Sequence, residues 1–182
     1  MVPVLETPRL WLNPLELADA PAIQALFPHW EIVRCLADVP WPYPPDGALA
    51  YLRAAALPAM ARGDAWHWSL RLKTCPGTLI GCIGLTRGEA ENRGFWLGLP
   101  WQGRGLMTEA SEAVNAFWFG TLGFPLLRVP KAAGNAASRR ISEKNGMRLA
   151  ATGERDYVGG RMPTEVWELT AEAWRRRTQV VP

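Results

Sequence analysis

Several short stretches of the chain alternate apolar and polar residues, which is the two-residue period of a half-buried strand. This alternation predicts strands over residues 9–13, 65–73, 78–86, 93–99, 126–132, 147–154 and 164–170. Other stretches repeat apolar residues at helical spacing, and they predict helices over residues 19–27, 32–37, 46–62, 106–122 and 135–145. The prolines between Pro40 and Pro45 exclude regular structure there. Pro76-Gly77 predicts the turn of a hairpin between the second and third strands.

The predicted elements give a mixed α and β fold. At its centre lies a unit of strand, glycine-bearing loop, helix and strand, which covers residues 93–132. A chain of 182 residues, 48% of them hydrophobic, can bury one sizeable core but not two, so we expect a single domain over residues 1–182. The first residues lack the pattern of a secretory signal, and no run approaches the roughly 20 apolar residues of a membrane helix. We therefore expect a cytoplasmic protein without a membrane partner.

Charge and cysteine content narrow the chemistry. A formal net charge of +3 favours solubility or a small anionic ligand over a nucleic-acid partner. Cys35, Cys75 and Cys82 follow no metal-ligand spacing, so we expect free thiols and no metal.

The loop at residues 102–107 joins a predicted strand to a predicted helix. Free backbone N–H groups and the positive end of the helix converge at such a turn, and glycines let a pyrophosphate approach the backbone closely. The dinucleotide fingerprint requires a third glycine where the chain has Thr108, and a P-loop requires Gly-Lys-Ser or Gly-Lys-Thr. Neither fits, so the loop indicates a phosphate-bearing ligand of another kind, or simply a tight connection.

Three motifs, in the expected order, resemble the GNAT superfamily of N-acetyltransferases. Gly94–Leu97 with Trp101–Ala110 resembles its CoA-binding motif, and Thr7–Leu10 resembles the first strand of the branch that includes the ribosomal-protein N-terminal acetyltransferases. Residues 135–147 resemble the Asn-x-x-Ser to Glu-Lys-x-Gly-Phe segment of that branch. Met107 stands where the family has Gly or Ala, and Met147 where it prefers an aromatic residue.

The resemblance implies a mostly antiparallel sheet of about six to seven strands, splayed at the cofactor site, with helices on both faces. It also implies acetyl-CoA as co-substrate and transfer of the acetyl group to a primary amine. The cofactor-binding residues that it implies are Trp96, Leu97, Gly98, Gln102, Gly103, Arg104, Gly105, Leu106, Met107, Thr108, Asn135, Ser138 and Arg139. Lys131, Arg139 and Arg140 lie near enough in sequence to meet the ribose phosphate, or else they form a solvated surface.

The catalytic groups are less well defined by the sequence. Ser142 stands seven residues after Asn135, where many relatives have a tyrosine that protonates the thiolate, and a plain helix serine is the alternative. Glu89 and Glu91 precede the central strand and are candidate bases, although Asn92 occupies the position where many relatives have Glu. Histidines are common proton carriers, but we expect His29 and His67 to serve packing or lie on the surface.

The resemblance places five aromatic residues in segments that form the acceptor wall, namely Trp30, Trp41, Tyr43, Trp66 and Trp68. The acceptor itself stays open among a protein N-terminus, an amino acid, a polyamine and an aminoglycoside, and we favour an α-amine because it deprotonates more easily. A non-catalytic acyl-CoA sensor on the same fold is the alternative function. A DNA-recognition helix over residues 136–144 is a poorer alternative, because no helix precedes it by a short turn. We expect a monomer or a homodimer.

Overall fold

The computed structural model describes residues 1–179 and contains two antiparallel sheets. The five-stranded sheet has the order β1-β2-β3-β4-β5, and the three-stranded sheet has the order β6-β8-β7. The strands are β1 (Leu5–Glu6), β2 (Leu10–Pro14), β3 (Ala65–Leu72), β4 (Cys75–Thr86), β5 (Arg93–Leu97), β6 (Leu126–Ala132), β7 (Arg148–Tyr157) and β8 (Gly160–Thr170). The predicted mixed fold with a divided, mostly antiparallel sheet is confirmed.

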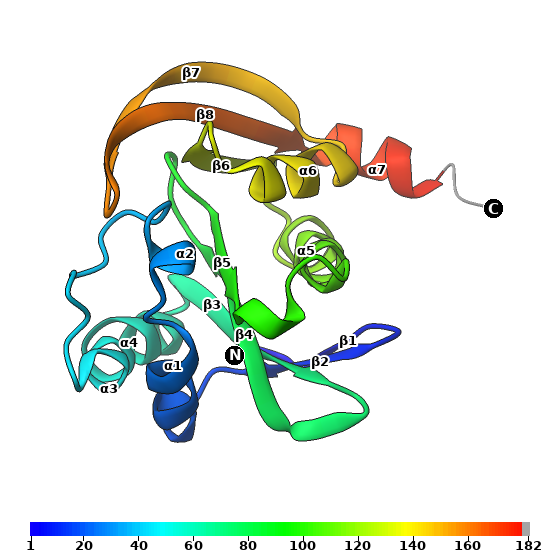
Figure 1. The fold of residues 1–182 in the computed structure, drawn as a ribbon. Coiled ribbons are helices and arrows are strands. Elements are labelled where there is room, and N and C mark those ends of the chain that lie inside the picture. Colours follow the sequence, from blue (N-terminus) through cyan, green and yellow to red (C-terminus); the bar gives the residue numbers. More distant parts are fainter. Residues whose placement is uncertain (180–182) are drawn as a thin grey trace.

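Helices cover both faces of the five-stranded sheet (Figure 1). The segments before β3 are η1 (Leu17–Asp19), α1 (Ala20–Leu26), α2 (Trp30–Val33), α3 (Gly47–Tyr51), η2 (Leu52–Ala56) and α4 (Leu57–Arg62). The later ones are η3 (Leu99–Trp101), α5 (Leu106–Ala116), η4 (Phe117–Thr121), α6 (Ala136–Lys144) and α7 (Ala171–Gln179). In Figure 1, α1 and α3 lie on one side of the sheet and α5 on the other, while β7 and β8 arch over α6.

Two predicted helices are each continuous but contain a wide turn. Residues 47–62 form α3, η2 and α4, where η2 is one turn of π-helix. Pro58 lacks the N–H that would bond to the carbonyl one turn earlier, so the helix widens ahead of it. Residues 106–121 form α5 followed by η4, which is also one turn of π-helix. This helix ends just before Gly123, as the sequence indicated.

Several boundaries differ from the sequence prediction. Helix α2 spans Trp30–Val33 instead of residues 32–37, because the Arg34 and Leu36 carbonyls accept hydrogen bonds from the amides of Gly159 and Val158. Those two amides belong to the tight turn between β7 and β8, whose strands extend further than predicted. The hairpin of β3 and β4 turns before Cys75, and Pro76-Gly77, the predicted turn, lies inside β4 at a register irregularity.

Side chains on alternate positions of the sheet enter two separate cores. Trp66, Trp68 and Leu70 of β3 pack on the face covered by α5, whereas Cys82 of β4 packs on the face covered by α1 and α3. Within residues 1–179, no helix is long and apolar enough to cross a membrane.

Candidate active site

Strands β5 and β6 lie next to each other at one end and then separate. Asn92 joins them there: its N–H donates to the Arg128 carbonyl at 2.8 Å, and its Oδ1 accepts from the Arg128 N–H at 2.7 Å. Beyond this junction the strands belong to different sheets. Asn92 is buried, and its Nδ2 also donates to the carbonyls of Thr86 and Gly88. This side chain therefore closes the base of the opening.

A small cavity of about 80 Å³ occupies the opening between the strands. Its walls include Phe95 on β5, Val129 and Lys131 on β6, and Asn135 and Ser138 at the start of α6. The Gly98 N–H donates to the Ile80 carbonyl on β4, so by strand alternation the amides of Phe95 and Leu97 point the other way, into the opening. These free amides can bind the polar groups of an extended ligand arm, and we call this space the slot.

The glycine loop lies beside the outer end of β5. Gly103 and Gly105 have φ of +74° and +75°, a left-handed conformation that costs other residues about 1–2 kcal/mol. Gly105 precedes the first turn of α5, where no side chain caps the free N–H groups. The side chains of Leu106 and Met107 are buried in the core, so these residues and Thr108 offer a ligand chiefly their amides.

A clamp from the start of the chain holds this loop. The Glu109 carboxylate accepts hydrogen bonds from the Thr7 hydroxyl, from the Arg9 N–H at 2.8 Å and from Arg9 Nε at 2.6 Å. Arg9 Nη1 donates to the Arg104 carbonyl at 3.0 Å. Although burial alone would raise the pKa of Glu109, these hydrogen bonds and the Arg9 charge hold it below its ordinary value. The Thr7–Leu10 motif thus fixes the loop from about 100 residues away in sequence, a link that local patterns do not show.

Two residues expected on the cofactor have other partners. Gln102 Nε2 donates to the Leu97 carbonyl at 2.8 Å and so ties the loop to the end of β5. Arg139 forms an ion pair with Glu165 and also donates to the Ala133 carbonyl. The Arg104 residue is exposed.

Helix α6 places three of the predicted polar residues near the slot. Asn135 Oδ1 accepts from the Ser138 N–H at 3.1 Å and caps the helix. Lys131 Nζ donates to the Ser138 carbonyl at 3.0 Å and to Ser142 Oγ. Ser142 is fully buried and lies behind Lys131, outside the lining of the slot.

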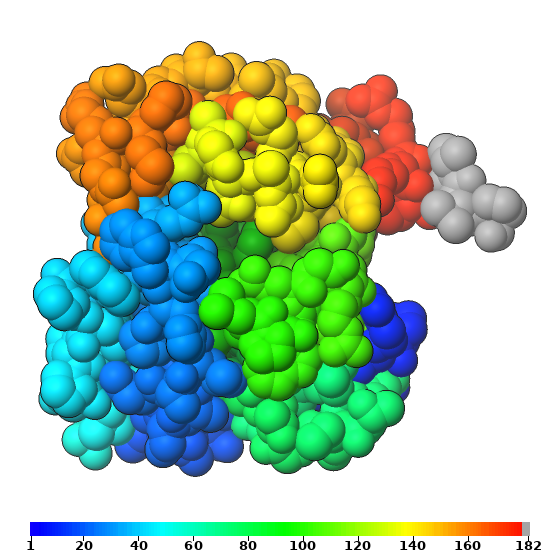
Figure 2. All heavy atoms as spheres, in the orientation of Figure 1, coloured from blue at the N-terminus to red at the C-terminus, as the bar shows by residue number. Residues whose placement is uncertain are grey.

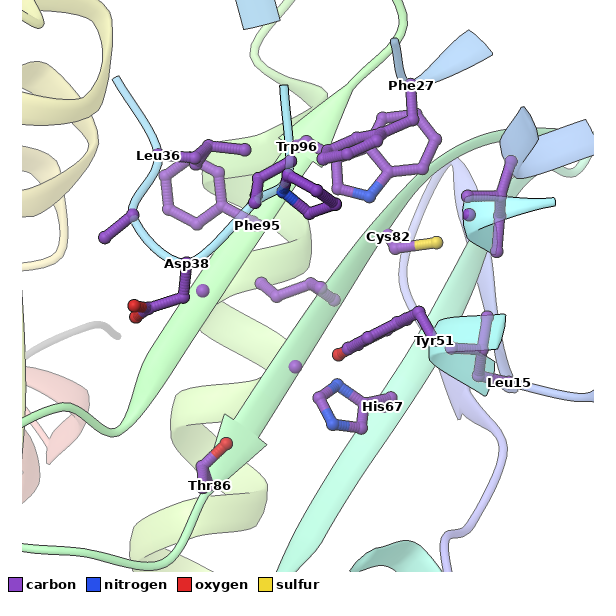
Figure 3. A pocket seen from close by; sticks show the side chains of 18 of the residues that line it. Leu15, Phe27, Leu36, Asp38, Tyr51, His67, Cys82, Thr86, Phe95 and Trp96 are labelled. Atoms are coloured by element: carbon purple, nitrogen blue, oxygen red, sulfur yellow. The ribbon is translucent and has the colours of Figure 1, made fainter. Parts of the chain in front are cut away.

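A second, larger cavity of about 750 Å³ lies on the α1 and α3 side of the sheet. Figure 3 shows Phe27, Trp96 and Cys82 around it and Tyr51 reaching from α3 over β4 toward His67. It shares wall residues with the slot, among them Gly94 and Phe95. The molecular surface is hollowed between the N-terminal helices, the α5 region and α6 (Figure 2).

The five aromatic residues predicted for the acceptor wall lie in three different places in the structure. Tyr43 lines the large cavity, as expected from its position. Trp66 and Trp68 are buried on the opposite face of β3, so placing them on the acceptor wall is corrected. Trp30 and Trp41 pack against each other, with ring centroids 5.7 Å apart, and both remain exposed outside the cavity lining.

His67 was expected in packing or on the surface, but it lines the large cavity. It lies between Trp66 and Trp68 on β3. Because successive side chains of a strand point to opposite faces, two buried tryptophans on one face indicate that His67 points to the other face. A Cβ at Gly84 would lie 2.1 Å from His67 Nδ1, so the imidazole covers this glycine. Burial lowers the pKa of His67 to about 4, which keeps the ring neutral at neutral pH.

The carboxylates before β5 lie at the edge of the site. Glu91 lines the cavity mouth and pairs with Arg155 of β7 at 2.9 Å. Glu89 is exposed and lies outside both cavity linings, and its backbone carbonyl accepts from Arg128. Within residues 1–179, no group of three His, Cys, Asp or Glu side chains is arranged to hold a metal ion.

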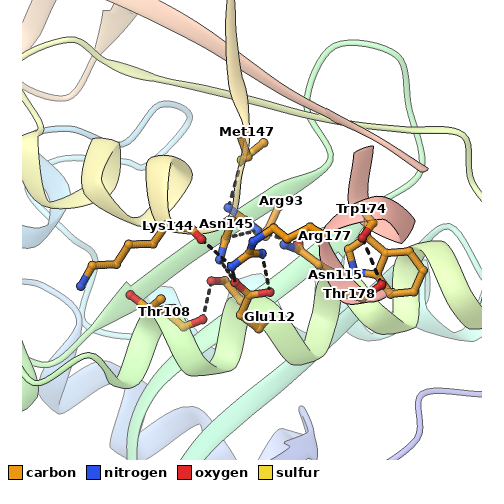
Figure 4. Close-up of polar contacts among 11 residues, drawn as sticks. Arg93, Thr108, Glu112, Asn115, Lys144, Asn145, Met147, Trp174, Arg177 and Thr178 are labelled. Atoms are coloured by element: carbon orange, nitrogen blue, oxygen red, sulfur yellow. Dashed lines mark hydrogen bonds and ion pairs between the residues drawn. The ribbon is translucent and has the colours of Figure 1, made fainter. Parts of the chain in front are cut away.

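Below the slot, a polar network joins β5 to three helices (Figure 4). Buried Arg93 Nη1 donates to Asn115 Oδ1 at 2.7 Å and to Asn145 Oδ1 at 2.9 Å. Asn145 and Arg177 both donate to Glu112. Burial lowers the pKa of Arg93 to about 10, so the guanidinium remains charged at neutral pH.

The slot suits a long, narrow ligand arm, the loop at its end suits a pyrophosphate, and the adjoining cavity has room for a second substrate. An enzyme that transfers an acyl group from coenzyme A requires this combination. An acetyltransferase (GNAT) domain matches residues 9–148, so the chain belongs to the GNAT family of acetyl-CoA-dependent N-acetyltransferases.

Solved structures with a similar fold include three ribosomal-protein acetyltransferases. RimL, a ribosomal L7/L12 α-N-protein acetyltransferase in complex with coenzyme A, has a TM-score of 0.80 and 17% identity over 94% of this chain and 99% of that one. A ribosomal-protein-S5-alanine acetyltransferase from Vibrio fischeri has a TM-score of 0.79 and 15% identity, over 94% and 98% of the two chains. A putative ribosomal-protein-serine acetyltransferase from Vibrio cholerae has a TM-score of 0.73 and 19% identity, over 93% and 99%. No curated protein matches the sequence.

Proposed function

We propose that the protein acetylates the α-amine of a peptide, protein or small molecule by direct attack on acetyl-CoA in a ternary complex. The observation that carries this proposal is the shared wall of the two cavities at Gly94 and Phe95. A thioester in the slot and an amine in the large cavity meet there without an intervening carrier. Cys82 lines the cavity, but burial raises the pKa of its thiol, which makes it a poor nucleophile.

The cofactor would lie along the slot and the glycine loop. The amides of Phe95 and Leu97 can hold the acetyl oxygen and the pantetheine arm, and the amides at the start of α5 can hold the pyrophosphate. Acetyl-CoA supplies the activated acetyl group. The chain's own contribution is to orient the thioester carbonyl, exclude water and bring the amine within reach.

The protonation chemistry favours an α-amine. An alkylammonium with a pKa near 10.4 costs roughly 4 kcal/mol to deprotonate at neutral pH, whereas an α-amine near 7.8 costs about 1 kcal/mol. Asn92 is bound at the strand junction, and Glu91, the candidate base at the cavity mouth, is already paired with Arg155. Enzymes with the same fold include one named for α-N-protein acetylation, which agrees with this acceptor class.

The test compares initial rates of thiol release with a dipeptide and with spermidine between about pH 6.5 and 9. We expect the dipeptide to be faster near neutral pH and spermidine to gain as the pH rises. Spermidine faster at neutral pH would contradict the proposal of an α-amine acceptor.

A further inference from the structure

The lining of the large cavity is largely apolar. Its lining includes Leu15, Ile23, Phe27, Tyr43, Cys82 and Trp96. Figure 3 labels Leu15, Phe27, Cys82 and Trp96 among them. A volume of about 750 Å³ is in the range of pockets that enclose a whole small ligand. An amine alone would leave most of this wall in contact with water.

Three aromatic rings make this wall rigid. The centroid of Phe27 lies 5.2 Å from that of Trp96 and 5.3 Å from that of Tyr43, both in edge-to-face geometry. A Cβ at Gly47 would lie 2.8 Å from the Tyr43 ring, so the backbone of α3 holds that ring in place. A preformed aromatic wall of this kind binds an apolar side chain with little loss of conformational entropy.

The mouth of the cavity carries more negative than positive charge. Asp38, Asp46 and Glu91 line it, and Arg155 is bound by Glu91 at 2.9 Å and by Asp38 at 3.5 Å. Among the described lining residues the other guanidinium, that of Arg93, is bound by two asparagines. An ammonium group is therefore attracted, whereas the carboxylate of a free amino acid meets no available cation.

We infer that the acceptor is the N-terminus of a peptide or protein whose first residue has a large apolar side chain, which lies against Phe27, Tyr43 and Trp96. This inference rests on the proposed function and adds the substrate class. The slot side supplies the acetyl group, the acidic mouth attracts the α-ammonium, and the aromatic wall selects the first side chain.

The experiment measures kcat/KM for short peptides with a blocked carboxyl end that begin with phenylalanine, serine, glycine or aspartate. Burial of a large apolar side chain should favour phenylalanine over glycine or serine by about 10- to 100-fold. Equal or faster acetylation of the serine or glycine peptide would overturn the inference while leaving the proposed α-amine chemistry intact. If only an amine that is not an α-amine, such as spermidine, is acetylated, the proposed function fails as well.

A matched pair of variants locates the selection in this cavity. Ala50→Trp adds bulk at an exposed position that lines the cavity, and Ala55→Trp adds the same bulk at an exposed position outside the lining. We expect Ala50→Trp to lower kcat/KM for the phenylalanine peptide at least about tenfold and for the glycine peptide less than about twofold. Equal effects of the two variants on the phenylalanine peptide would show that its side chain binds elsewhere.

A second, independent observation concerns Lys131. This residue is 5% exposed, and within residues 1–179 its Nζ has no carboxylate within ion-pair distance. Glu165 is already bound by Arg139 and by Trp167 Nε1. Lys131 Nζ also lies over the Trp167 ring, 5.9 Å from its centroid, but a cation–π contact of this kind offsets only part of the cost of burying a cation without an ion-pair partner.

The geometry leaves part of the Lys131 ammonium available to the slot. An ammonium group has three N–H donors, and two of them are taken by the Ser138 carbonyl and by Ser142 Oγ. Lys131 itself lines the slot, whereas Ser142 does not. The third donor is therefore the one that can reach a ligand there.

The structure assigns to Lys131 the role of proton donor to the departing CoA thiolate, with Ser142 as the residue that positions its Nζ. The amine nitrogen forms the new bond to the acetyl carbon, the carbon–sulfur bond breaks, and sulfur keeps the electron pair. Lys131 then gives a proton to sulfur, and the proton released by the attacking nitrogen restores the ammonium. This proposal also rests on the proposed function.

The electrostatics around Lys131 agree with such a transfer. Burial, together with the charges of Arg93 on β5 and Arg139 on α6, lowers the pKa of Lys131 to about 7, against the opposing charges of Glu165 on β8 and Glu143 on α6. A thiol titrates near 8.5, so transfer from this ammonium to the thiolate is downhill. The donor is charged below about pH 7 and is lost above it.

The test is the pH dependence of kcat with an acceptor whose amine titrates well below neutral pH, such as a hydrazide. Wild type should lose rate above about pH 7, and Lys131→Met should lower kcat about 100-fold with an unchanged KM for acetyl-CoA. Lys131→Arg keeps the charge but cannot give up a proton, so its kcat should fall about as far as that of Lys131→Met. Ser142→Ala should cost about fivefold, the equivalent of one positioning hydrogen bond.

Thermal melting of each variant separates a folding defect from a catalytic one. If Lys131→Met is folded and its kcat lies within about twofold of wild type, Lys131 is not the donor. A decline above pH 7 that persists in Lys131→Met would likewise overturn the assignment. A Ser142→Ala loss as large as that of Lys131→Met, with Lys131→Arg unaffected, would identify Ser142 as the direct donor instead.

Discussion

The clamp between Arg9 and Glu109 gives a prediction that links the start of the chain to cofactor binding. In Glu109→Gln one carboxylate oxygen becomes an NH₂ group. One of the Thr7 and Arg9 groups that now donate a hydrogen bond to the carboxylate would then face another donor. A hydrogen bond to a charged group contributes about 1.5–3 kcal/mol. Because the Arg9 side chain is 49% exposed and can turn to water, we discount the loss to about 1–2 kcal/mol.

This loss should lower the melting temperature by about 3–6 °C in a chain of this length. It should also weaken acetyl-CoA binding, because Arg9 Nη1 holds the Arg104 carbonyl in the glycine loop. The assay is thermal melting with and without acetyl-CoA, together with a binding titration. The matched control is Glu172→Gln, whose carboxylate is 74% exposed and forms only an i,i+4 pair with Arg176. It should change stability by less than about 0.5 kcal/mol.

The contribution of Glu109 to stability should depend on pH. The pKa of Glu109 is lower in the folded chain than its unfolded value near 4.3, so its contribution is fully present above about pH 5 and is lost as the pH falls through the folded pKa. The stability difference between wild type and Glu109→Gln should therefore shrink toward pH 3. If Glu109→Gln melts within about a degree of Glu172→Gln at neutral pH, the reasoning about the clamp is wrong.

Three further predictions test the loop, the buried network and the tryptophans. Acetyl-CoA at 100 times its dissociation constant should stabilise wild type by about 2.7 kcal/mol, and Gly105→Val should abolish most of that shift in a melting experiment. Arg93→Met should lower the unfolding free energy in urea by about 2 kcal/mol or more, because the oxygens of Asn115 and a second asparagine lose their donor; no change would contradict the network in Figure 4. Trp68→Ala should cost about 3–5 kcal/mol in urea unfolding and Trp30→Ala less than about 1, and equal costs would contradict their placement in the core and at the surface.

Periodicity was sufficient for most of the fold. The alternation around Leu10, Leu70 and Leu127 predicted strands because one face of each is buried, and the helical repeat before Gly123 predicted α5 with η4. The wide turn before Pro58 and the early end of α2 were not predictable in this way. They depend on one missing N–H and on carbonyls that bond to a distant hairpin.

The part of the site that depends on local backbone conformation, the glycine loop, was predictable from the sequence. Two glycines at a strand-to-helix turn indicate left-handed backbone and free amides, and the structure has both at Gly103 and Gly105. The contacts of Glu109 with Arg9 and of Arg155 with Glu91 join residues far apart in sequence, so no spacing reveals them. Alternation along β3 would have placed His67 opposite its tryptophan neighbours.

The most direct test of the central claim is thiol release from acetyl-CoA by the purified protein, measured with and without a peptide that has a free N-terminus and a large apolar first residue. We expect release that requires the peptide, with one N-acetylated peptide formed per thiol released, as identified by mass. Acetyl-CoA binding without peptide-dependent thiol release would contradict it.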